Sequence, residues 1–340
     1  MKLLIFSDKN KIAFQSKRQL IWLSNYLKEK NEGVDLTFAE NFNFNHDNFD
    51  VILIHGYNTS NIKTFKSRYP FSKIILLNPG LLTQYHEIKM ISKNKIKSKL
   101  QKRLIDKNID AILVRSEAWA NVVRKNTHLP VYKWIDFEET VSYSPKNKII
   151  NTPPIIGYHG NPFHLINNFK INGAPALEDL YKTHKFNFHI LSNNIKMIKK
   201  EFQYDFPIKY FEYSEVDFDS IISNFDIGVS PTMGNLSSLD DTNVYIRNAN
   251  RTISLLSKGI PSVTSPLPQA QIDLKNNLHT VFAVSKKEWF ESIKKLLDDD
   301  TFYKNISENG YKHVKDNFCV NKGAEKLVEI IEKVLDGKNL

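Results

Sequence analysis

Two arginines four residues apart, Arg247 and Arg251, stand at the start of a short helical pattern and could bind an anion. The apolar pattern that begins at Ile253 stops at the Gly-Ile-Pro segment 259–261, where glycine allows a left-handed cap and proline cannot continue a helix. Backbone N–H groups at a helix start, the positive end of its dipole and two guanidinium groups would converge here, which is the chemistry of a phosphate or diphosphate site. The alternative is an exposed, solvated helix start.

The segment 157–164 reads Gly-Tyr-His-Gly-Asn-Pro-Phe-His and follows an apolar strand pattern. Its glycines allow the backbone to approach a ligand closely, and His159, Asn161 and His164 could form hydrogen bonds there. Loops that follow parallel strands carry the binding sites of α/β sheets, so a ligand-binding loop is favoured over a plain strand-to-helix turn. The spacing differs from the GxGxxG fingerprint, and NAD binding therefore gains no support.

Three polar residues in the first half of the chain are candidates for acid–base chemistry. Imidazole titrates near neutral pH, and His86, in the polar stretch 78–87 after an apolar strand, is the best candidate for a general base. His55 ends another predicted strand and is its rival, and Asp8 follows the first predicted strand. For each of the three, a hydrogen-bonded structural role is at least as good an interpretation.

Short apolar runs that alternate with helical patterns recur through both halves of the chain and predict parallel β-sheets buried on both faces. The polar segment 138–151 separates the two halves. We therefore predict an α/β protein with two Rossmann-like domains, 1–145 and 152–321, followed by a helix within 322–340. The predicted strands are 2–6, 34–38, 49–55, 73–77, 110–115 and 131–135 in the first half, and 155–158, 188–191, 208–211, 226–230, 262–265 and 280–283 in the second.

The composition is typical of a globular protein, and a length of 340 residues favours two domains over one. Cys319 is the single cysteine, which excludes an internal disulfide and is typical of a small buried residue. The N-terminal apolar run is too short for a signal peptide, and no stretch approaches the ~20 apolar residues that span a bilayer. We expect a cytoplasmic protein.

The net charge of +10 indicates anionic partners such as phosphorylated substrates, anionic lipid or nucleic acid. The segment 89–107 contributes eight Lys or Arg residues against the single acid Asp106. Ile96, Leu100 and Leu104 recur every four residues in it and form one apolar stripe on a cationic helix. Such a helix can lie on an anionic membrane surface at the inner face of the membrane, or pack on the sheet with a solvated basic side.

Three segments, in order, resemble the GT-B glycosyltransferases, within the broad group that includes family 4. The run Arg-Asn-Ala-Asn-Arg-Thr-Ile-Ser-Leu-Leu-Ser-Lys-Gly-Ile-Pro-Ser-Val-Thr-Ser-Pro at 247–266 is similar to that group's Lys-Ser-x-Asn-Lys run, which leads to Gly-x-Pro-Val. Segment 225–231 looks like its x-Asp-Ile-Gly-Leu-x-Pro strand, and 110–117 looks like the strand that ends its N-terminal domain. Five residues before the glycine, where the group has a glutamate that commonly contacts the donor ribose, this chain has Ser254.

The resemblance implies a two-domain enzyme with a cleft between its domains. It implies that the C-terminal domain holds a nucleotide-sugar donor, that the acceptor enters from the N-terminal domain, and that the last helix crosses back to that domain. Arg247 and Arg251 would hold the diphosphate, and Tyr213 would lie near the base. The candidate donor-binding residues are His159, Gly160, Asn161, His164, Tyr213, Ser230, Arg247, Asn250, Arg251 and Thr252.

We expect no metal and no cofactor. Asp240 and Asp241 lie in a long polar loop, whereas a metal-bridged diphosphate needs carboxylates held at a strand end. The carboxylates at 298–300 lie where they would cap a helix, and no cluster of Cys and His residues suggests zinc. Enzymes of the resembled fold usually work without a metal.

The sequence therefore predicts a glycosyltransferase that moves a sugar from a nucleotide donor to a saccharide or lipid-linked acceptor. The resemblance implies a setting in bacterial surface polysaccharide or lipopolysaccharide assembly. One alternative is a GT-B nucleotide-sugar epimerase, which would need carboxylates to move a proton. Another is a nucleic-acid-binding protein, which the charge allows but for which no RNP-like, helix-turn-helix or zinc signature is present.

Overall fold

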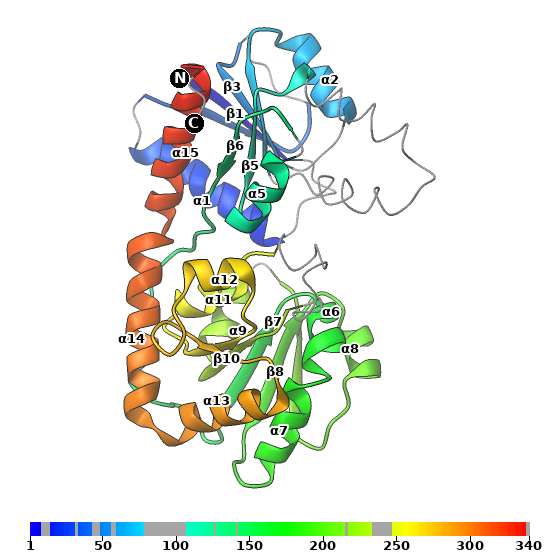
Figure 1. Ribbon diagram of the computed structural model, residues 1–340, viewed down its shortest axis with the longest axis vertical. Helices are drawn as coiled ribbons and strands as arrows, with labels where there is room; N and C mark the ends of the chain where they lie inside the picture. Colours follow the sequence, from blue (N-terminus) through cyan, green and yellow to red (C-terminus); the bar gives the residue numbers. More distant parts are fainter. Residues whose placement is uncertain are drawn as a thin grey trace. The chain divides into compact units, whose positions relative to one another are not determined.

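The computed structural model describes residues 1–7, 14–30, 33–42, 48–55, 59–77, 107–125, 127–140, 142–214, 217–232 and 247–337. The chain divides into two compact units. Unit 1 comprises Met1–Phe137 and Val320–Leu340, and unit 2 comprises Glu138–Cys319. Figure 1 shows the helices and strands of each unit.

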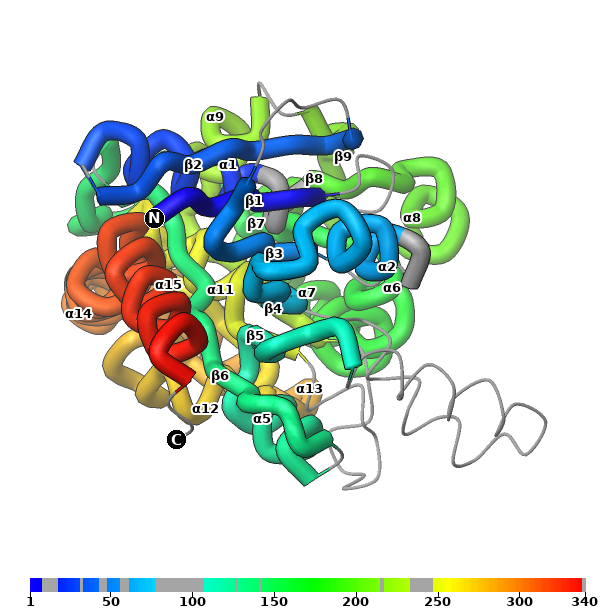
Figure 2. The backbone as a smooth tube through the Cα atoms, turned by 90° about the horizontal axis from the view of Figure 1, so that it is seen from above, coloured from blue at the N-terminus to red at the C-terminus, as the bar shows by residue number. Residues whose placement is uncertain are grey.

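Unit 1 contains a parallel six-stranded sheet in the order β2-β1-β3-β4-β5-β6, which can be followed in Figure 2. Its inner strands β1, β3, β4 and β5 are largely apolar because other elements cover both faces, as expected for parallel sheets. The strands are β1 (Lys2–Ser7), β2 (Asp35–Ala39), β3 (Val51–His55), β4 (Lys73–Leu77), β5 (Ala111–Val114) and β6 (Val131–Lys133).

Helices cover both faces of this sheet. Helices α1 (Phe14–Lys30) and α15 (Val320–Leu335) pack together on one face, with the core formed by alternate strand residues such as Leu3 and Leu53. Helix α2 (Thr59–Arg68) covers the opposite face through Ile62 and Phe65. The last helix of the chain therefore belongs to the core of the unit that contains the first strand (Figure 1).

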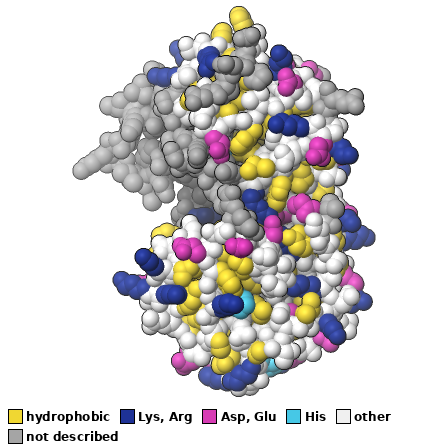
Figure 3. Space-filling view, turned by 180° about the vertical axis from the view of Figure 1, so that it is seen from behind, with side chains coloured by type: hydrophobic (Ala, Val, Ile, Leu, Met, Phe, Trp, Pro, Cys, Tyr) yellow, Lys and Arg dark blue, Asp and Glu magenta, His cyan; other side chains and the backbone are white. Residues whose placement is uncertain are grey.

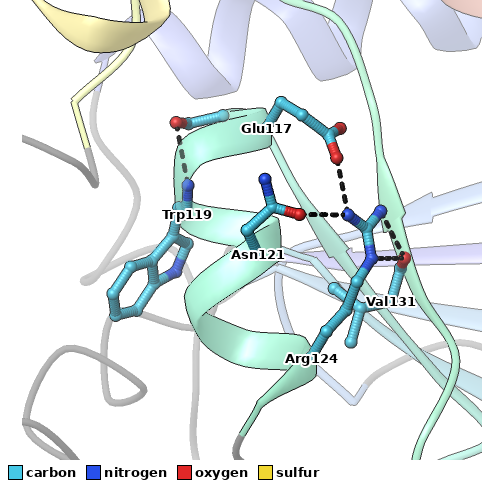
Figure 4. Close-up of polar contacts among 6 residues, drawn as sticks. Glu117, Trp119, Asn121, Arg124 and Val131 are labelled. Atoms are coloured by element: carbon cyan, nitrogen blue, oxygen red, sulfur yellow. Dashed lines mark hydrogen bonds and ion pairs between the residues drawn. The ribbon is translucent and has the colours of Figure 1, made fainter.

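Arg124, the last residue of helix α5 (Glu117–Arg124), hydrogen-bonds to the neighbouring strand β6 (Figure 4). Ser116 caps the helix by accepting a hydrogen bond from the backbone N–H of Trp119, at 3.2 Å. The guanidinium of Arg124 donates to the backbone oxygen of Val131 and to the side chains of Glu117 and Asn121. Arg124 is thus an arginine whose structural role is fully accounted for.

Unit 2 contains a second parallel six-stranded sheet, in the order β12-β11-β10-β7-β8-β9. The order differs from that of unit 1 because β8 and β9 are added in turn on one side of β7, before the chain crosses to β10 on the other side. The strands are β7 (Ile155–His159), β8 (Asn187–Ser192), β9 (Ile208–Glu212), β10 (Ile227–Ser230), β11 (Ser262–Thr264) and β12 (Val281–Phe282).

The core on one face of this sheet joins alternate strand residues such as Ile156 and Tyr158 to helices η1, α7, α8 and α13. The other face receives Phe218 from α9 and Leu255 from α11. The helices are α6 (Pro162–His164), the π-helix η1 (Leu165–Phe169), α7 (Gly173–Tyr181), α8 (Ile195–Glu201), α9 (Phe218–Ser223), α11 (Asn250–Leu256), α12 (Pro268–Asp273), α13 (Lys286–Asp298) and α14 (Asp300–Asn317).

Two glycines allow neighbouring side chains to pack closely against the second face of this sheet. A Cβ at Gly228 would lie 2.5 Å from the side chain of Leu255, and a Cβ at Gly157 would lie 2.1 Å from the ring of Phe225. Larger residues would push these side chains outward. The glycine in β10 therefore fixes how close helix α11, which carries Arg251, comes to the sheet.

The predicted α/β architecture with two Rossmann-like sheets is confirmed, and each predicted strand matches an observed one to within a few residues. Asp299 caps α14 by accepting from the N–H of Phe302 at 2.8 Å, as the sequence predicts. Cys319 is buried, as expected. The basic segment 89–107 lies outside the described residues except for Lys107.

The surface shown in Figure 3 carries Lys and Arg side chains interspersed with Asp and Glu on both units. Within the part of the chain that the structure describes, no helix combines the length and the apolar character needed to cross a membrane.

Candidate functional site

The candidate site of unit 2 lies at the carboxyl ends of its parallel strands. The strand order reverses between β7 and β10, where Gly160 directly follows β7 and Ser230 is the last residue of β10. Ligands of open α/β sheets bind outside the carboxyl ends of the strands at such a reversal. Helix α11, which follows the loop from β10, begins at Asn250 and brings Arg251 to the same edge.

The guanidinium of Arg251 is the centre of this edge. Its Nη2 donates to the backbone oxygen of Pro231 at 2.7 Å. It also hydrogen-bonds to the hydroxyl of Tyr158, which in turn donates to the backbone oxygen of Asn161 at 2.6 Å. Burial lowers the pKa of Arg251, and the neighbouring Tyr158 and Tyr213 oppose that shift. An arginine nevertheless stays protonated in proteins, so a positive charge is held at the strand ends.

Arg251 is held in a way that leaves part of its guanidinium without a protein partner. Its buried Nε has no hydrogen-bond partner among the described residues. A buried donor of this kind is unfavourable unless a ligand or water supplies an acceptor. The edge is therefore suited to an anionic group that accepts hydrogen bonds from Arg251.

Gly160 is required where it stands. Its φ of 137° is a conformation that other residues rarely adopt, and a Cβ there would lie 2.9 Å from Cδ of Arg251 and 3.0 Å from the hydroxyl oxygen of Tyr158. Its backbone is held from both sides, because its N–H donates to Leu191 and its oxygen accepts from the hydroxyl of Ser192. Any side chain at this position would displace the arginine.

The structure brings His164 together with both predicted arginines. His164 is buried, and its pKa is lowered first by burial and then by the positive charges of Arg251 and Arg247. His159 also lies beside Arg251, with Nε2 at 3.2 Å from the arginine's backbone oxygen, and its ring forms a T-shaped pair with that of Phe218. His164 is thus a neutral imidazole in a region of positive potential, near neutral pH.

Several other predicted residues have identifiable structural partners. Asn161 caps α6 by accepting from the N–H of Phe163 at 3.0 Å. Thr252 is buried, with its hydroxyl oxygen 3.1 Å from that of Thr264. The backbone oxygen of the buried Ser230 accepts from the N–H of Ser265.

Tyr213 and Asn250 are more open. Tyr213 follows β9 and stacks on Phe218 with ring centroids 5.4 Å apart, while its charge interaction with Arg251 places it near the site. Asn250 is the first residue of α11 and is partly buried. Ser254, in contrast, is completely buried in α11, and its hydroxyl has no hydrogen-bond partner among the described residues.

Sequence reasoning missed two contributors. The first is Tyr158, which lies within the predicted strand 155–158: its ring belongs to the apolar core, and its hydroxyl reaches Arg251. The second is the π-helix η1, in which Asn168 donates to the backbone oxygen of Thr232 after β10. Single-turn π segments often occur at functional sites, but no local signal in the sequence marks this one.

Of the three acid–base candidates in unit 1, only His55 lies within the described residues. His55 ends β3, and burial, followed by the charge of Arg115, lowers its pKa to about 4. Asp8 and His86 lie outside the described residues, as do Asp240 and Asp241. Within the described ranges, no three His, Cys, Asp or Glu side chains are grouped so that they could hold a metal ion.

Comparison with known proteins identifies the fold. No family model matches the sequence, and no curated protein sequence matches it significantly. Sucrose-phosphate synthase from Thermosynechococcus elongatus has a similar structure with a TM-score of 0.67 at 10% identity, covering 99% of this chain and 100% of that one. HepE from Anabaena, solved in complex with UDP and glucose, gives a TM-score of 0.65 at 10% identity, covering 98% and 100%.

A glycosyltransferase from Rickettsia africae is similar with a TM-score of 0.65 at 13% identity and covers 99% of each chain. Because these similarities extend over nearly the whole chain, this protein has the GT-B glycosyltransferase fold. The predicted fold class is thereby confirmed.

The electrostatic environment of His164 predicts how stability depends on pH. In the unfolded chain its imidazole takes up a proton near pH 6.5, whereas in the folded protein it stays neutral. Stability should therefore fall as the pH is lowered through 6.5. Between pH 7.5 and 5.5, the free energy of unfolding should fall by about 1.4 kcal/mol more in the wild type than in His164→Gln. Urea unfolding at both pH values measures this, and equal losses would contradict it.

Proposed function

We propose that this protein is a glycosyltransferase that moves a sugar from a nucleotide-sugar donor to a saccharide or lipid-linked acceptor. The observation that carries the proposal is the arginine cluster of unit 2, at the strand-order reversal of a GT-B fold. There the positive charges of Arg251 and Arg247 both lower the pKa of His164. Two guanidinium groups near one another at the carboxyl ends of parallel strands suit a diphosphate.

In this proposal the arginines stabilise the charge that develops on the departing nucleoside diphosphate. Preorganised cationic donors act more strongly in a buried site than in water, and Arg251 is fixed in advance by Pro231 and Tyr158. The neutral His164 adds no positive charge of its own, but its ring could hydrogen-bond to the donor. In this proposal Tyr213 contacts the nucleotide base. The UDP bound in HepE supports a UDP-type donor as the first candidate.

Removal of the central guanidinium should weaken nucleotide binding. Charge-assisted hydrogen bonds contribute about 1.5–3 kcal/mol, so Arg251→Ala should raise the Kd for UDP by roughly 10- to 100-fold. Arg251→Lys, which keeps the charge but loses the bidentate fork, should lie between that variant and the wild type. Isothermal titration calorimetry measures the three affinities, with GDP and CMP titrated in parallel.

The matched control is Arg124→Ala, which removes an arginine from unit 1 whose partners are Glu117, Asn121 and Val131 (Figure 4). It should leave nucleotide affinity unchanged. If folded Arg251→Ala binds the nucleotide as tightly as the wild type, the arginine cluster does not hold the diphosphate. Stabilisation by oligonucleotides in place of nucleotides would favour the nucleic-acid-binding alternative.

We propose His86 as the general base, ahead of His55 and Asp8. The low pKa of His55 makes it a weak base that stays neutral at neutral pH, which suits it better to hydrogen bonding than to proton abstraction. His86→Ala should therefore retain the wild-type Kd for the nucleotide and reduce turnover by about 100-fold or more. Donor consumption and product analysis with a saccharide acceptor measure turnover. Unchanged turnover would reject His86 as the base, and an epimerised sugar nucleotide would reject transfer.

We further propose that the protein works in the cytoplasm at the inner membrane face, in assembly of bacterial surface polysaccharide or lipopolysaccharide. The charge and apolar spacing of segment 89–107 support contact with anionic lipid. The protein should sediment with vesicles that contain phosphatidylglycerol more than with neutral phosphatidylcholine vesicles, and 0.5 M salt, a high ionic strength for surface charges, should reduce binding. Equal sedimentation with both vesicle types would reject membrane contact through this segment.

A further inference from the structure

The sheet of unit 1 changes from apolar to polar at its carboxyl edge, on the face covered by α1. Side chains two residues apart in a strand point to the same face, so each strand presents one row to this helix. Along β1 and β3, and along β5 and β6 with the residues that follow them, the row has two apolar or aromatic members and then a polar one. The rows are Leu3-Ile5-Ser7, Val51-Leu53-His55, Ala111-Leu113-Arg115 and Tyr132-Trp134-Asp136.

Arg115 is the most constrained member of this polar edge. Its side chain is 4% exposed, and its Nη1 donates to Asp136 at 2.9 Å and also to the side-chain oxygen of Gln19 in α1. These two bonds use both N–H groups of Nη1. The buried Nε and Nη2 have no hydrogen-bond partner among the described residues.

The unused atoms of Arg115 form one edge of the planar guanidinium. An ion pair with a purely structural role would be expected to satisfy its donors, because leaving them unmet in the interior is unfavourable. Arg115 instead keeps three N–H groups available while Asp136, Gln19 and the ring of Trp134, 5.2 Å from the guanidinium carbon, hold the group in place. The Nε–Nη2 edge matches the two oxygens of a carboxylate or phosphate.

Two further polar atoms of the same edge have no described partner. The hydroxyl of the completely buried Ser7 and the buried Nε2 of His55 both lack a hydrogen-bond partner among the described residues. Ser7 and His55 are register partners on the adjacent strands β1 and β3. The strand order of unit 1 reverses between these two strands, where ligands of open α/β sheets bind.

Arg115 and His55 are close enough to interact electrically, because the charge of the arginine contributes to the low pKa of the histidine. His55 is therefore neutral near neutral pH, and its Nε2 can donate to an anion in the tautomer that carries the proton there. The positive charge of Arg115 is already shared with Asp136, so one additional negative charge fits better than two.

We propose that Arg115, His55 and Ser7 form a binding site for a singly charged oxyanion, a carboxylate or a phosphodiester, carried by the acceptor. The identification of the ligand as an acceptor rests on the proposed glycosyl transfer, but the site itself does not. The acceptor class is thus an acidic saccharide or a phosphodiester-linked one.

The test measures binding of small probes to the full chain by ligand-observed NMR in saturating UDP. Methyl β-D-glucuronide represents the carboxylate and dimethyl phosphate the phosphodiester, with methyl β-D-glucoside as the neutral control. At least one anionic probe should bind about tenfold more tightly than the glucoside, and the one that binds identifies the source of the charge. Failure of both to exceed the glucoside would overturn the proposal.

The variants test which residues are responsible. Arg115→Lys keeps a charge beside Asp136 but removes the Nε–Nη2 edge, and should weaken binding of the anionic probe about tenfold or more. Ser7→Ala should weaken it about threefold to tenfold, and this smaller change carries the test if Arg115→Lys does not fold. Arg124→Ala, an arginine of the same unit with all its partners described in Figure 4, should have no effect.

If folded Arg115→Lys and Ser7→Ala both bind the anionic probe with wild-type affinity, the site is not where we place it. The result is separable from the proposed function. Arg251→Ala should weaken the binding of UDP but not that of the anionic probe. Arg115→Lys should weaken the binding of the anionic probe but not that of UDP. Loss of probe binding with intact UDP binding thus tests unit 1 alone.

Discussion

A guanidinium group can be taken out of water only if its charge and its N–H groups are compensated, and this constraint organises the carboxyl edge of both sheets. In unit 2 Arg251 is held by the backbone of Pro231 and by Tyr158. In unit 1 Arg115 is held by Asp136 and Gln19. Each arginine is fixed on one side by the protein and keeps donors on another side. Groups fixed in this way are positioned before a ligand arrives, which reduces the cost of ordering them on binding.

The strand orders explain why these arginines lie at the edge of the sheet where ligands of open α/β sheets bind. Each sheet has a reversal in strand order, between β7 and β10 in unit 2 and between β1 and β3 in unit 1. At a reversal the connections leave in opposite directions, so the strand ends are not covered by the same crossover. Gly160 borders the first reversal, and Ser7 and His55 border the second. Both sheets thus have polar residues beside a reversal in strand order, but the side chains at the two edges differ in chemistry.

These surroundings determine the protonation state of two histidines. His164 and His55 are both buried beside arginine charge, and both have a lowered pKa for the same two reasons. In both positions a neutral imidazole offers a hydrogen bond without adding positive charge. A histidine with so low a pKa is a weak base at neutral pH, and His86 remains our proposed base.

The sequence by itself determined the positions of the strands and the two-sheet architecture, and it singled out the arginine pair at 247 and 251 as a candidate anion site. These features depend on local patterns: an apolar run long enough for a buried strand, a glycine followed by proline, and cationic residues one helical turn apart. They could be predicted because each pattern lies within about twenty residues, a span over which chain geometry alone sets what is adjacent.

The tertiary structure decided which of these residues meet. Asn161 serves as a helix cap, and Ser254 is completely buried. Arg115 looked like the last residue of a strand, and its role became visible only once Gln19 and Asp136 were placed beside it. Strand order and packing bring such residues together across many intervening positions. No local period in the sequence encodes that proximity, because it results from how the two sheets bury their apolar faces.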